Sequence, residues 1–357
     1  MIKKTIRFIK KKIIKSFFLI INGKIKLNSH KKVKLFETHN IKFKNGKNCN
    51  LFEIENCRIF YNKIADVAYI KDNFFLKEPS TQISEYIHRP SKTNYVFQNG
   101  TPKFKKNLNK TVFSTLYTTA SSFNYYHWII EVLPKLAILE SSHLKKKVDY
   151  YLFPSLKKRF QNESLDLLNI PKKKRLSADK FSHIQAKKIL SCEHPYIRKN
   201  QLKEDTNYPG WLIYWLKKKF LRKIKKKKSI NIFIDRGDSL IQNRKILNEG
   251  EIKKYLLKKN FKFIKLSNYS FKKQIELFFN AKCVVGLHGA GFVNIIFCKK
   301  GTKIVELSTV NKLNPLESLA KKNNLKYFKI FPNEKSIGQR SQDVTGKFSL
   351  KLLQKII

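Results

Sequence analysis

Residues 283–307, CVVGLHGAGFVNIIFCKKGTKIVEL, decide the fold class of this 357-residue chain. The short apolar runs CVVGL and KIVEL predict two buried strands, and AGFVNIIF between them predicts a short helix. We therefore predict an α/β fold with a parallel sheet, in which ligands bind beyond the carboxyl ends of the strands. The same alternation continues on both sides from residue 229 onward, with INIFI, FKFIKL and LKYFKI as strands and NEGEIKKYLLKK, SFKKQIELFFNA and NPLESLAKK as helices.

A glycine-lined turn with one histidine, His288, joins the first of these strands to its helix. Gly286, Gly289 and Gly291 allow a sharp turn and the close approach of another group to the backbone. The helix is expected to begin near Ala290, so its N–H groups and positive dipole end favour an anion, most naturally phosphate. The other interpretation is a tight turn with a structural histidine, because the spacing differs from G-x-G-x-x-G.

Two arginines follow the strand INIFI, in a chain that has ten arginines and otherwise relies on lysine. Guanidinium groups bind diphosphate oxygens in a forked geometry that an ammonium group lacks. We therefore predict that Arg236 and Arg244 bind an anionic ligand. Asn248 and Glu251 have the spacing of a helix-start capping pair, which leaves Glu249 open to a role in ligand binding.

The segment FNYYHWIIEVLPKL, residues 123–136, places a histidine and a carboxylate four residues apart. On a helix His127 and Glu131 share one face, where the carboxylate can orient the imidazole or raise its basicity, as a general base requires. The other interpretation is an aromatic-rich core helix with one hydrogen-bonded histidine. We expect the helix over residues 124–142, with a kink at Pro134.

The N-terminal segment, residues 1–22, is basic, contains no acidic residue, and has apolar residues at near-helical spacing. This pattern predicts a basic amphipathic helix that lies on an anionic membrane surface, or else a solvated and frayed terminus. Its apolar core is short and no small-residue cleavage site follows, so the sequence does not predict a signal peptide.

The remaining patterns predict the domain organisation. Residues 24–118 alternate in a way that favours short strands, and further strands are expected at TVFSTLYTT and VDYYLF. Helices are expected over 155–168 and, as a long basic bridge, over 209–227. We therefore predict an N-terminal domain at 23–228, a C-terminal Rossmann-like domain at 229–335 and a C-terminal tail or helix at 336–357.

The formal net charge of +51 is the most extreme feature of the composition. Lysine is spread along the whole chain and no RNP, zinc-finger or helix-turn-helix pattern accompanies it, so we interpret the charge as a compositional bias and expect no nucleic-acid partner. No apolar run approaches the roughly 20 residues that span a bilayer. The five cysteines lack C-x-x-C spacing, so neither a zinc site nor a disulfide framework is predicted, and reduced thiols fit a cytoplasmic protein.

Three blocks resemble, in this order, the signature of glycosyltransferase family 61, the DUF563 group, which includes bacterial capsular polysaccharide proteins. They are NYYHW with Pro134, then Arg236 and Arg244 followed by NE, then HGAGFVNIIF followed by VEL. The resemblance implies a GT-B-like architecture, with two Rossmann-like domains facing across a cleft and here a β-rich N-terminal segment. It also implies inverting transfer from a nucleotide sugar, commonly a UDP-sugar. The chain contains no Asp-x-Asp metal clamp, so we expect positive protein groups to neutralise the leaving diphosphate without a metal.

The resemblance also implies roles for single residues. His288 is expected to bind a phosphate or the transferring sugar, and His127 to be the catalytic base, with Glu131 or a residue not identified from the sequence as the alternative. Asp235 departs from the family pattern, in which serine often precedes the first arginine; a carboxylate there weakens anion binding unless it turns away or pairs with lysine. The expected donor-binding residues are Arg236, Arg244, Glu249, Gly289, Ala290, Gly291, Asn294, which holds the turn or touches the donor, and Glu306, which binds the ribose hydroxyls.

The sequence therefore predicts an inverting glycosyltransferase that acts on a glycan or lipid-linked glycan hydroxyl in surface polysaccharide synthesis. We expect it in the cytoplasm, peripheral on the inner face of the membrane, with no metal or other cofactor. Two alternatives remain open at this stage. One is a non-catalytic nucleotide- or glycan-binding protein of the same fold, and the other is a basic nucleic-acid-binding protein whose affinity falls steeply with salt.

Overall fold

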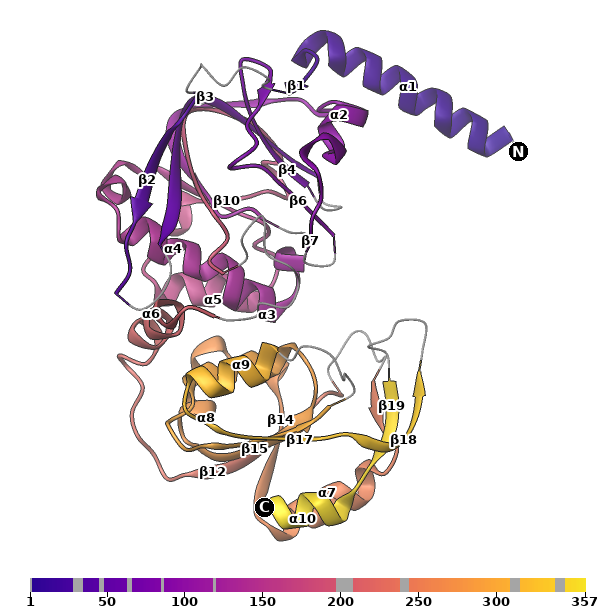
Figure 1. Ribbon diagram of the computed structural model, residues 1–357, viewed down its shortest axis with the longest axis vertical. Coiled ribbons are helices and arrows are strands. Elements are labelled where there is room, and N and C mark those ends of the chain that lie inside the picture. Colours follow the sequence, from indigo (N-terminus) through magenta and orange to yellow (C-terminus); the bar gives the residue numbers. More distant parts are fainter. Residues whose placement is uncertain are drawn as a thin grey trace. The chain divides into compact units, whose positions relative to one another are not determined.

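The chain folds into two compact units, each with its own β-sheet (Figure 1). Unit 1 comprises residues 1–161 and 169–205, and unit 2 comprises residues 162–168 and 206–357. The sequence pattern places the border between its two domains at residue 228, whereas the units divide near residue 205. The structure is a computed structural model that describes residues 2–27, 35–44, 48–62, 66–84, 87–117, 120–196, 208–237, 244–308, 315–337 and 344–357.

Unit 1 is built on a mixed sheet of eleven strands. Eight of them follow the order β1-β5-β4-β3-β11-β8-β9-β10, while β2 pairs with β3, β6 pairs with β4, and β7 pairs with β6. Its strands are β1 (Lys26–Leu27), β2 (Glu37–Ile41), β3 (Cys49–Asn62), β4 (Asp66–Lys71), β5 (Phe74–Phe75), β6 (Thr81–Ser84), β7 (Ile87–His88), β8 (Lys106–Ser114), β9 (Tyr150–Phe153), β10 (Arg175–Ser177) and β11 (His183–Cys192). Its α-helices are α1 (Ile2–Asn22), α2 (Tyr95–Asn99), α3 (Tyr125–His127), α4 (Leu133–Glu140) and α5 (Arg159–Leu167), the last of which continues into unit 2.

Local sequence explains the antiparallel half of this sheet. Asp72 and Asn73, with φ of 50° and 61°, form the two-residue turn between β4 and β5, a conformation that Asp and Asn tolerate. Strand β3 is buried along most of its length, and it pairs in antiparallel fashion with β4 and β11. Strands β8, β9, β10 and β11 pair in parallel, so the unit combines an antiparallel half with a parallel half.

The predicted helix at 124–142 is confirmed in extent, but it is not uniformly α-helical. A π-helical turn, Trp128–Val132, separates α3 from α4, and the N–H of Leu133 donates to the carbonyl of Trp128 five residues back. Pro134 lies in the first turn of α4. Because proline lacks an N–H and its ring clashes with the carbonyl four residues back, the wider π turn accommodates it where we expected a kink.

Unit 2 contains a five-stranded sheet of order β14-β12-β15-β16-β17, and every pair in it is parallel. The parallel sheet predicted from residue 229 onward is therefore confirmed. Helices α7 and α10 pack on one face of the sheet, and α8 and α9 cover the other (Figure 1). The strands are β12 (Ile230–Asp235), β14 (Phe261–Lys265), β15 (Ala281–Leu287), β16 (Lys303–Leu307) and β17 (Lys326–Ile330), and the α-helices are α6 (Gly210–Phe220), α7 (Glu249–Lys258), α8 (Phe271–Phe279), α9 (Pro315–Lys322) and α10 (Leu350–Ile356).

Three features of unit 2 differ from the sequence prediction. The basic helix expected over 209–227 ends at Phe220, as α6, and belongs to unit 2. The segment AGFVNIIF forms a 3-10 helix, η7 (Ala290–Phe297), in place of an α-helix. A second sheet of three strands, β13 (Lys245–Ile246), β18 (Pro332–Ile337) and β19 (Val344–Phe348), joins residues of the arginine block to the C-terminal region.

Replacing Phe271 with alanine is expected to lower the free energy of unfolding of unit 2 by about 3–5 kcal/mol. Phe271 is fully buried, and its ring lies 5.1 Å from that of Phe220 on α6 and 6.4 Å from that of Phe297 on η7. Chemical denaturation measures the change. Leu257→Ala is the control, because Leu257 is 60% exposed and its loss should cost less than about 0.5 kcal/mol. Equal stabilities of the two variants would contradict the packing of α6 in this core.

Candidate functional site

The sheet of unit 2 has a topological switch point between β12 and β15. From β12 the chain crosses to β14 on one side, and it then returns to β15 on the other side. Parallel sheets bind ligands at such a reversal, beyond the carboxyl ends of the two strands. Arg236 directly follows β12 and His288 directly follows β15, so the two predicted residues lie at this point.

Two arginines hold the backbone of the glycine turn: Arg236, directly after β12, and Arg244, directly before β13. The carbonyl of His288 accepts hydrogen bonds from Nη1 of Arg236 and, at 3.1 Å, from Nη1 of Arg244. The two guanidinium groups therefore meet at one backbone oxygen. The structure brings together the arginine block and the histidine turn, which are separated in sequence by about 45–50 residues.

None of Gly286, Gly289 and Gly291 has a left-handed φ, so the backbone conformation of the turn does not require glycine. What requires glycine is the close packing of neighbouring side chains. A Cβ on Gly289 would lie 2.7 Å from Nη1 of Arg236, and one on Gly291 would lie 2.5 Å from Cδ1 of Leu266. These distances are shorter than any real Cβ contact, so side chains at these positions would displace their neighbours. The sharp turn expected from glycine is therefore less important here than the close approach of other groups.

Gly289→Ala is expected to displace Arg236 from the His288 carbonyl and to weaken the binding of an anionic ligand at this turn by about tenfold, equivalent to the loss of one hydrogen bond to a charged group. Titration calorimetry with a nucleoside diphosphate measures the change. Gly250→Ala in helix α7 is the matched control, since no atom lies within 4 Å of the added Cβ, and alanine there should slightly stabilise the helix. Unchanged affinity in Gly289→Ala would show that the arginine contact is not needed for binding.

A buried carboxylate fixes the orientation of the His288 imidazole. Glu306 on β16 is fully buried, and it accepts hydrogen bonds from Nδ1 of His288 and from the hydroxyl of Tyr327 on β17. The side chain of His288 is 19% exposed. The sequence suggested that Glu306 binds ribose hydroxyls, whereas its carboxylate lies in the protein interior and contacts these two side chains. The sequence does not predict a role for Tyr327. It reaches Glu306 only because β17 pairs with β16, and no sequence motif links the two residues.

A pocket of about 370 Å³ opens beside this turn. Lys253 lies 3.5 Å from Asp235 and 3.1 Å from Glu249, and the N–H of Gly237 donates to Asp235 at 2.8 Å. The carboxylate of Asp235 is thus paired with Lys253. This pairing offsets the repulsion that Asp235 would exert on an anion bound beside Arg236. The pocket is lined by Phe233, Ile234, Asp235, Arg236, Gly237, Arg244, Lys245, Ile246, Glu249, Lys253, Lys265 and Leu287.

Other predicted residues lie close to the turn without lining the pocket. Asn294 is fully buried in η7, and its amide donates to Gln274 on α8 at 3.1 Å, so it joins η7 to that helix. Ala290 and Gly291 form the first residues of η7. Asn248 is the N-cap residue of α7, as its spacing to Glu251 predicts, and its amide lies 3.4 Å from the Glu251 carboxylate. Its side chain does not cap a helix N–H, however, and instead bonds both backbone groups of Phe348.

In unit 1 the predicted pair of His127 and Glu131 is in contact. Nδ1 of His127 donates to Glu131 at 2.6 Å; His127 is 8% exposed and Glu131 is 1% exposed. Burial opposes a charge on His127, but the charge and the hydrogen bond of Glu131 outweigh it and raise the pKa of the imidazole. Burial likewise opposes a charge on Glu131, but His127 holds the pKa of this carboxyl well below its ordinary value.

Three further buried groups surround this pair. His194 lies 3.9 Å from Glu131, and its ring packs 4.2 Å from that of Tyr117. Burial lowers the pKa of His194 to about 4, so this imidazole is neutral at neutral pH. Lys135 donates to the carbonyl of Leu116 at 2.8 Å and lies over the Tyr117 ring. Lys135 follows Glu131 by four residues along the same helical segment. No spacing rule connects Tyr117 and His194 to His127; they follow the neighbouring strands β8 and β11 in the sequence.

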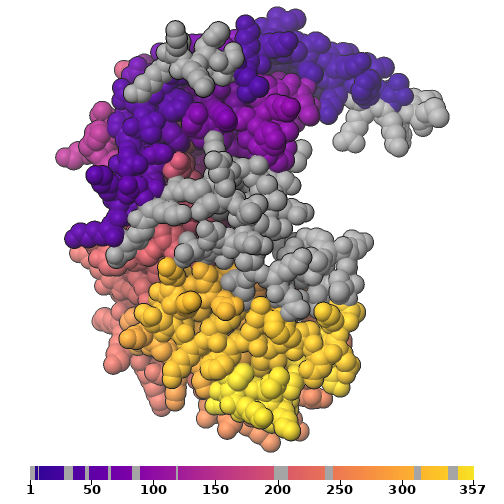
Figure 2. Space-filling view, viewed as in Figure 1, coloured from indigo at the N-terminus to yellow at the C-terminus, as the bar shows by residue number. Residues whose placement is uncertain are grey.

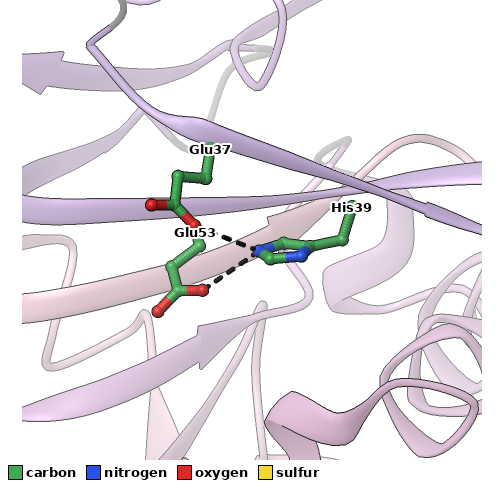
Figure 3. Close-up of side chains that lie close together, drawn as sticks. All are labelled: Glu37, His39 and Glu53. Atoms are coloured by element: carbon green, nitrogen blue, oxygen red, sulfur yellow. Dashed lines mark hydrogen bonds and ion pairs between the residues drawn. The ribbon is translucent and has the colours of Figure 1, made fainter.

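A separate group on the sheet of unit 1 holds two carboxylates and an imidazole (Figure 3). Nε2 of His39 lies 3.0 Å from Glu53 and 3.7 Å from Glu37, and the donor atoms lie within 4.8 Å of one another, close enough for a metal ion. However, Lys188 on β11 contacts Glu53, and although burial opposes the effect, Lys188 lowers the pKa of this carboxyl. We therefore interpret the group as an ion-pair network that ties β2, β3 and β11 together.

The family model described as Glycosyltransferase 61 matches residues 125–305, more than half of the 357 residues. The match includes His127 with Glu131 in unit 1, and the arginine block with the His288 turn in unit 2. A comparison with curated proteins gives no match. The resemblance predicted from three sequence blocks is thus confirmed by a continuous match: the chain belongs to glycosyltransferase family 61 and is a glycosyltransferase.

Proposed function

We propose that this glycosyltransferase transfers a sugar with inversion from a nucleotide sugar, with UDP as the expected nucleotide, to a hydroxyl of a glycan or lipid-linked glycan. The observation that carries the proposal is the basic pocket at the switch point of unit 2, beside a turn that Arg236 and Arg244 hold in place. Unit 2 is then the donor-binding half of a GT-B enzyme, and unit 1 the acceptor half. We assign the reaction to surface polysaccharide synthesis on the cytoplasmic side of a membrane.

Positive groups of the pocket and of the adjacent glycine turn neutralise the leaving diphosphate in this mechanism. Arg236 and Arg244 supply guanidinium groups, and the N–H groups at the start of η7 add a positive dipole end. The imidazole of His288, oriented by Glu306, hydrogen-bonds a phosphate oxygen or the sugar. Charge stabilisation by fixed donors in a sheltered site is usually the largest catalytic contribution, and here it needs no metal.

His127 is the proposed general base. As the acceptor oxygen attacks the anomeric carbon, the bond from that carbon to the diphosphate oxygen breaks, and the hydroxyl proton passes to the imidazole. Glu131 holds Nδ1 of His127, so Nε2 is the nitrogen assigned to take the proton. The buried carboxylate of Glu131 then stabilises the imidazolium that forms on His127, and this stabilisation explains why a base here is paired with a carboxylate.

The proposal is tested by following the thermal midpoint of the protein with UDP, GDP and CMP, each with and without EDTA. A specific nucleotide at about 100 times its dissociation constant should stabilise the protein by about 2.7 kcal/mol. Selective stabilisation that survives EDTA supports a metal-independent donor site. An equal response to every nucleotide and to inorganic triphosphate would show unspecific anion binding by the +51 charge and would overturn the proposal.

A further inference from the structure

Helix α1 carries a continuous apolar stripe that remains exposed. Ile6, Ile9, Ile13, Phe17 and Ile20 follow one another three or four residues apart, so they share one face of the helix. Their exposed fractions are 59%, 51%, 64%, 48% and 86%. Figure 2 shows the atoms of α1, in indigo, at the surface. The sequence left open whether this segment is frayed; within the described residues it is a regular helix of 21 residues.

A different side of α1 attaches it to the rest of unit 1. The amide of Asn22 donates to the carbonyl of Thr101 at 2.9 Å, and Arg58 donates to the carbonyl of Asn22 at 2.6 Å. The ring of Phe18 lies 5.1 Å from that of Phe104. With 3.6 residues per turn, Phe18 and Asn22 lie on the side of the helix opposite to the stripe. Apart from Phe17, whose ring lies 6.2 Å from that of Phe104, the stripe is therefore not the face by which the helix docks on its own unit.

The charges of α1 indicate what covers the stripe. Lys11, Lys12 and Lys15 lie outside the stripe, Lys10 lies at its border, and no acidic residue occurs in the chain before Glu37. A helix with an apolar face, a lysine-rich polar face and no acidic groups matches the boundary between the headgroups and acyl chains of an anionic bilayer. Pairing with a second copy would bring two sets of lysines together without any counter-charge.

We propose that α1 lies in the surface of a bilayer rich in anionic lipids, with the isoleucine stripe among the acyl chains and the lysines among the phosphates. None of the helices in the described part of the chain has the length and hydropathy of a membrane span. Phe104, 70% exposed and 6.2 Å from the ring of Phe17, adds a second insertion point from outside the helix.

The experiment uses the full chain and vesicles of phosphatidylcholine, with or without phosphatidylglycerol, in a sedimentation assay at two salt concentrations. The protein should bind the anionic vesicles and leave the neutral ones. Ile13→Ser with Ile20→Ser should weaken binding at least about tenfold, since both side chains lose burial in lipid. Leu257→Ser with Leu352→Ser is the matched control, because these leucines are 60% and 47% exposed and lie outside α1; its binding should stay within about twofold.

A charge variant separates the helix from the overall basicity of the chain. Lys10, Lys11 and Lys12 changed to glutamine should weaken binding by about fivefold for each lysine. Lys223, Lys225 and Lys226 changed to glutamine remove the same charge elsewhere and should leave it unchanged. Equal loss in the two variants would overturn the proposal, as would stripe variants that bind like the native chain. A dimer that the stripe variants dissociate, without vesicle binding, would assign the stripe to a second copy.

These results are independent of the donor site, because the thermal shift with nucleotide is measured without lipid. Since the substituted side chains on α1 are exposed, the variants should keep the nucleotide response of the native chain. Failure of vesicle binding would therefore leave the proposed glycosyl transfer intact, and failure of nucleotide binding would leave the membrane helix intact.

Discussion

His127→Asn should lower kcat by about 10²–10⁴-fold while the affinity for nucleotide stays unchanged. Asparagine keeps a polar side chain of similar size, but it cannot take the proton of the acceptor hydroxyl. Steady-state transfer assays and nucleotide titrations measure the two quantities. His143→Asn, at an exposed histidine of the same unit, is the control and should retain full activity. Transfer at a native rate by His127→Asn would exclude His127 as the base.

The same pair predicts the direction of the pH dependence. A general base acts in its neutral form, so kcat/KM should rise with pH through the pKa of His127, which Glu131 raises above the ordinary value of an imidazole. Glu131→Gln removes the charge that raises this pKa, so the rise should move to lower pH. The pKa of His194, about 4, lies below this range. A profile that does not move in Glu131→Gln would indicate that another group is the base.

Arg236→Ala together with Arg244→Ala should weaken nucleotide binding by about 10²-fold or more, because each hydrogen bond between charged groups contributes about 1.5–3 kcal/mol. Both arginines line the pocket, and both hold the carbonyl of His288. The double variant thus removes the positive charge and the anchor of the turn at once. Titration calorimetry with the nucleotide that stabilises the native chain gives the affinity.

Two further variants show whether the weaker nucleotide binding is specific to these arginines and whether it depends on charge alone. Arg222→Ala removes an exposed arginine and should bind nucleotide like the native chain. Arg236→Lys keeps the charge but replaces the planar fork with a point charge, so its affinity should lie between those of the native chain and Arg236→Ala. Native affinity in the double variant would place the nucleotide elsewhere, whereas full affinity in Arg236→Lys would show that charge alone is recognised.

The sequence predicted those parts of the structure that follow from short-range pattern. The alternation of apolar runs after residue 229 was sufficient for the parallel sheet, and strand ends placed Arg236 near His288. Helical spacing was sufficient for the contact between His127 and Glu131, four residues apart. In each case the geometry is determined by a fixed period or by the shared direction of parallel strands.

The parts that were not predicted depend on packing between distant segments. His194 reaches Glu131 because β11 lies beside β8, a pairing that no local pattern encodes. Tyr327 reaches Glu306 from the next strand, and it changes the interpretation of that carboxylate from a ligand for ribose to a support for His288. A sequence pattern indicates that a carboxylate follows an apolar run, but it does not indicate whether the carboxylate faces solvent or the interior.

Because of the π turn at Trp128–Val132, the number of residues between the proposed base, His127, and helix α4 cannot change without moving His127. Deleting one residue from it would allow an ordinary α-helix, but it would turn His127 by about 100° relative to the residues after Leu133. Compensating rotation is blocked, because all residues from 128 to 139 are buried. Surface loops of an enzyme tolerate insertions and deletions; this segment should tolerate neither, even where every individual side chain accepts a substitution.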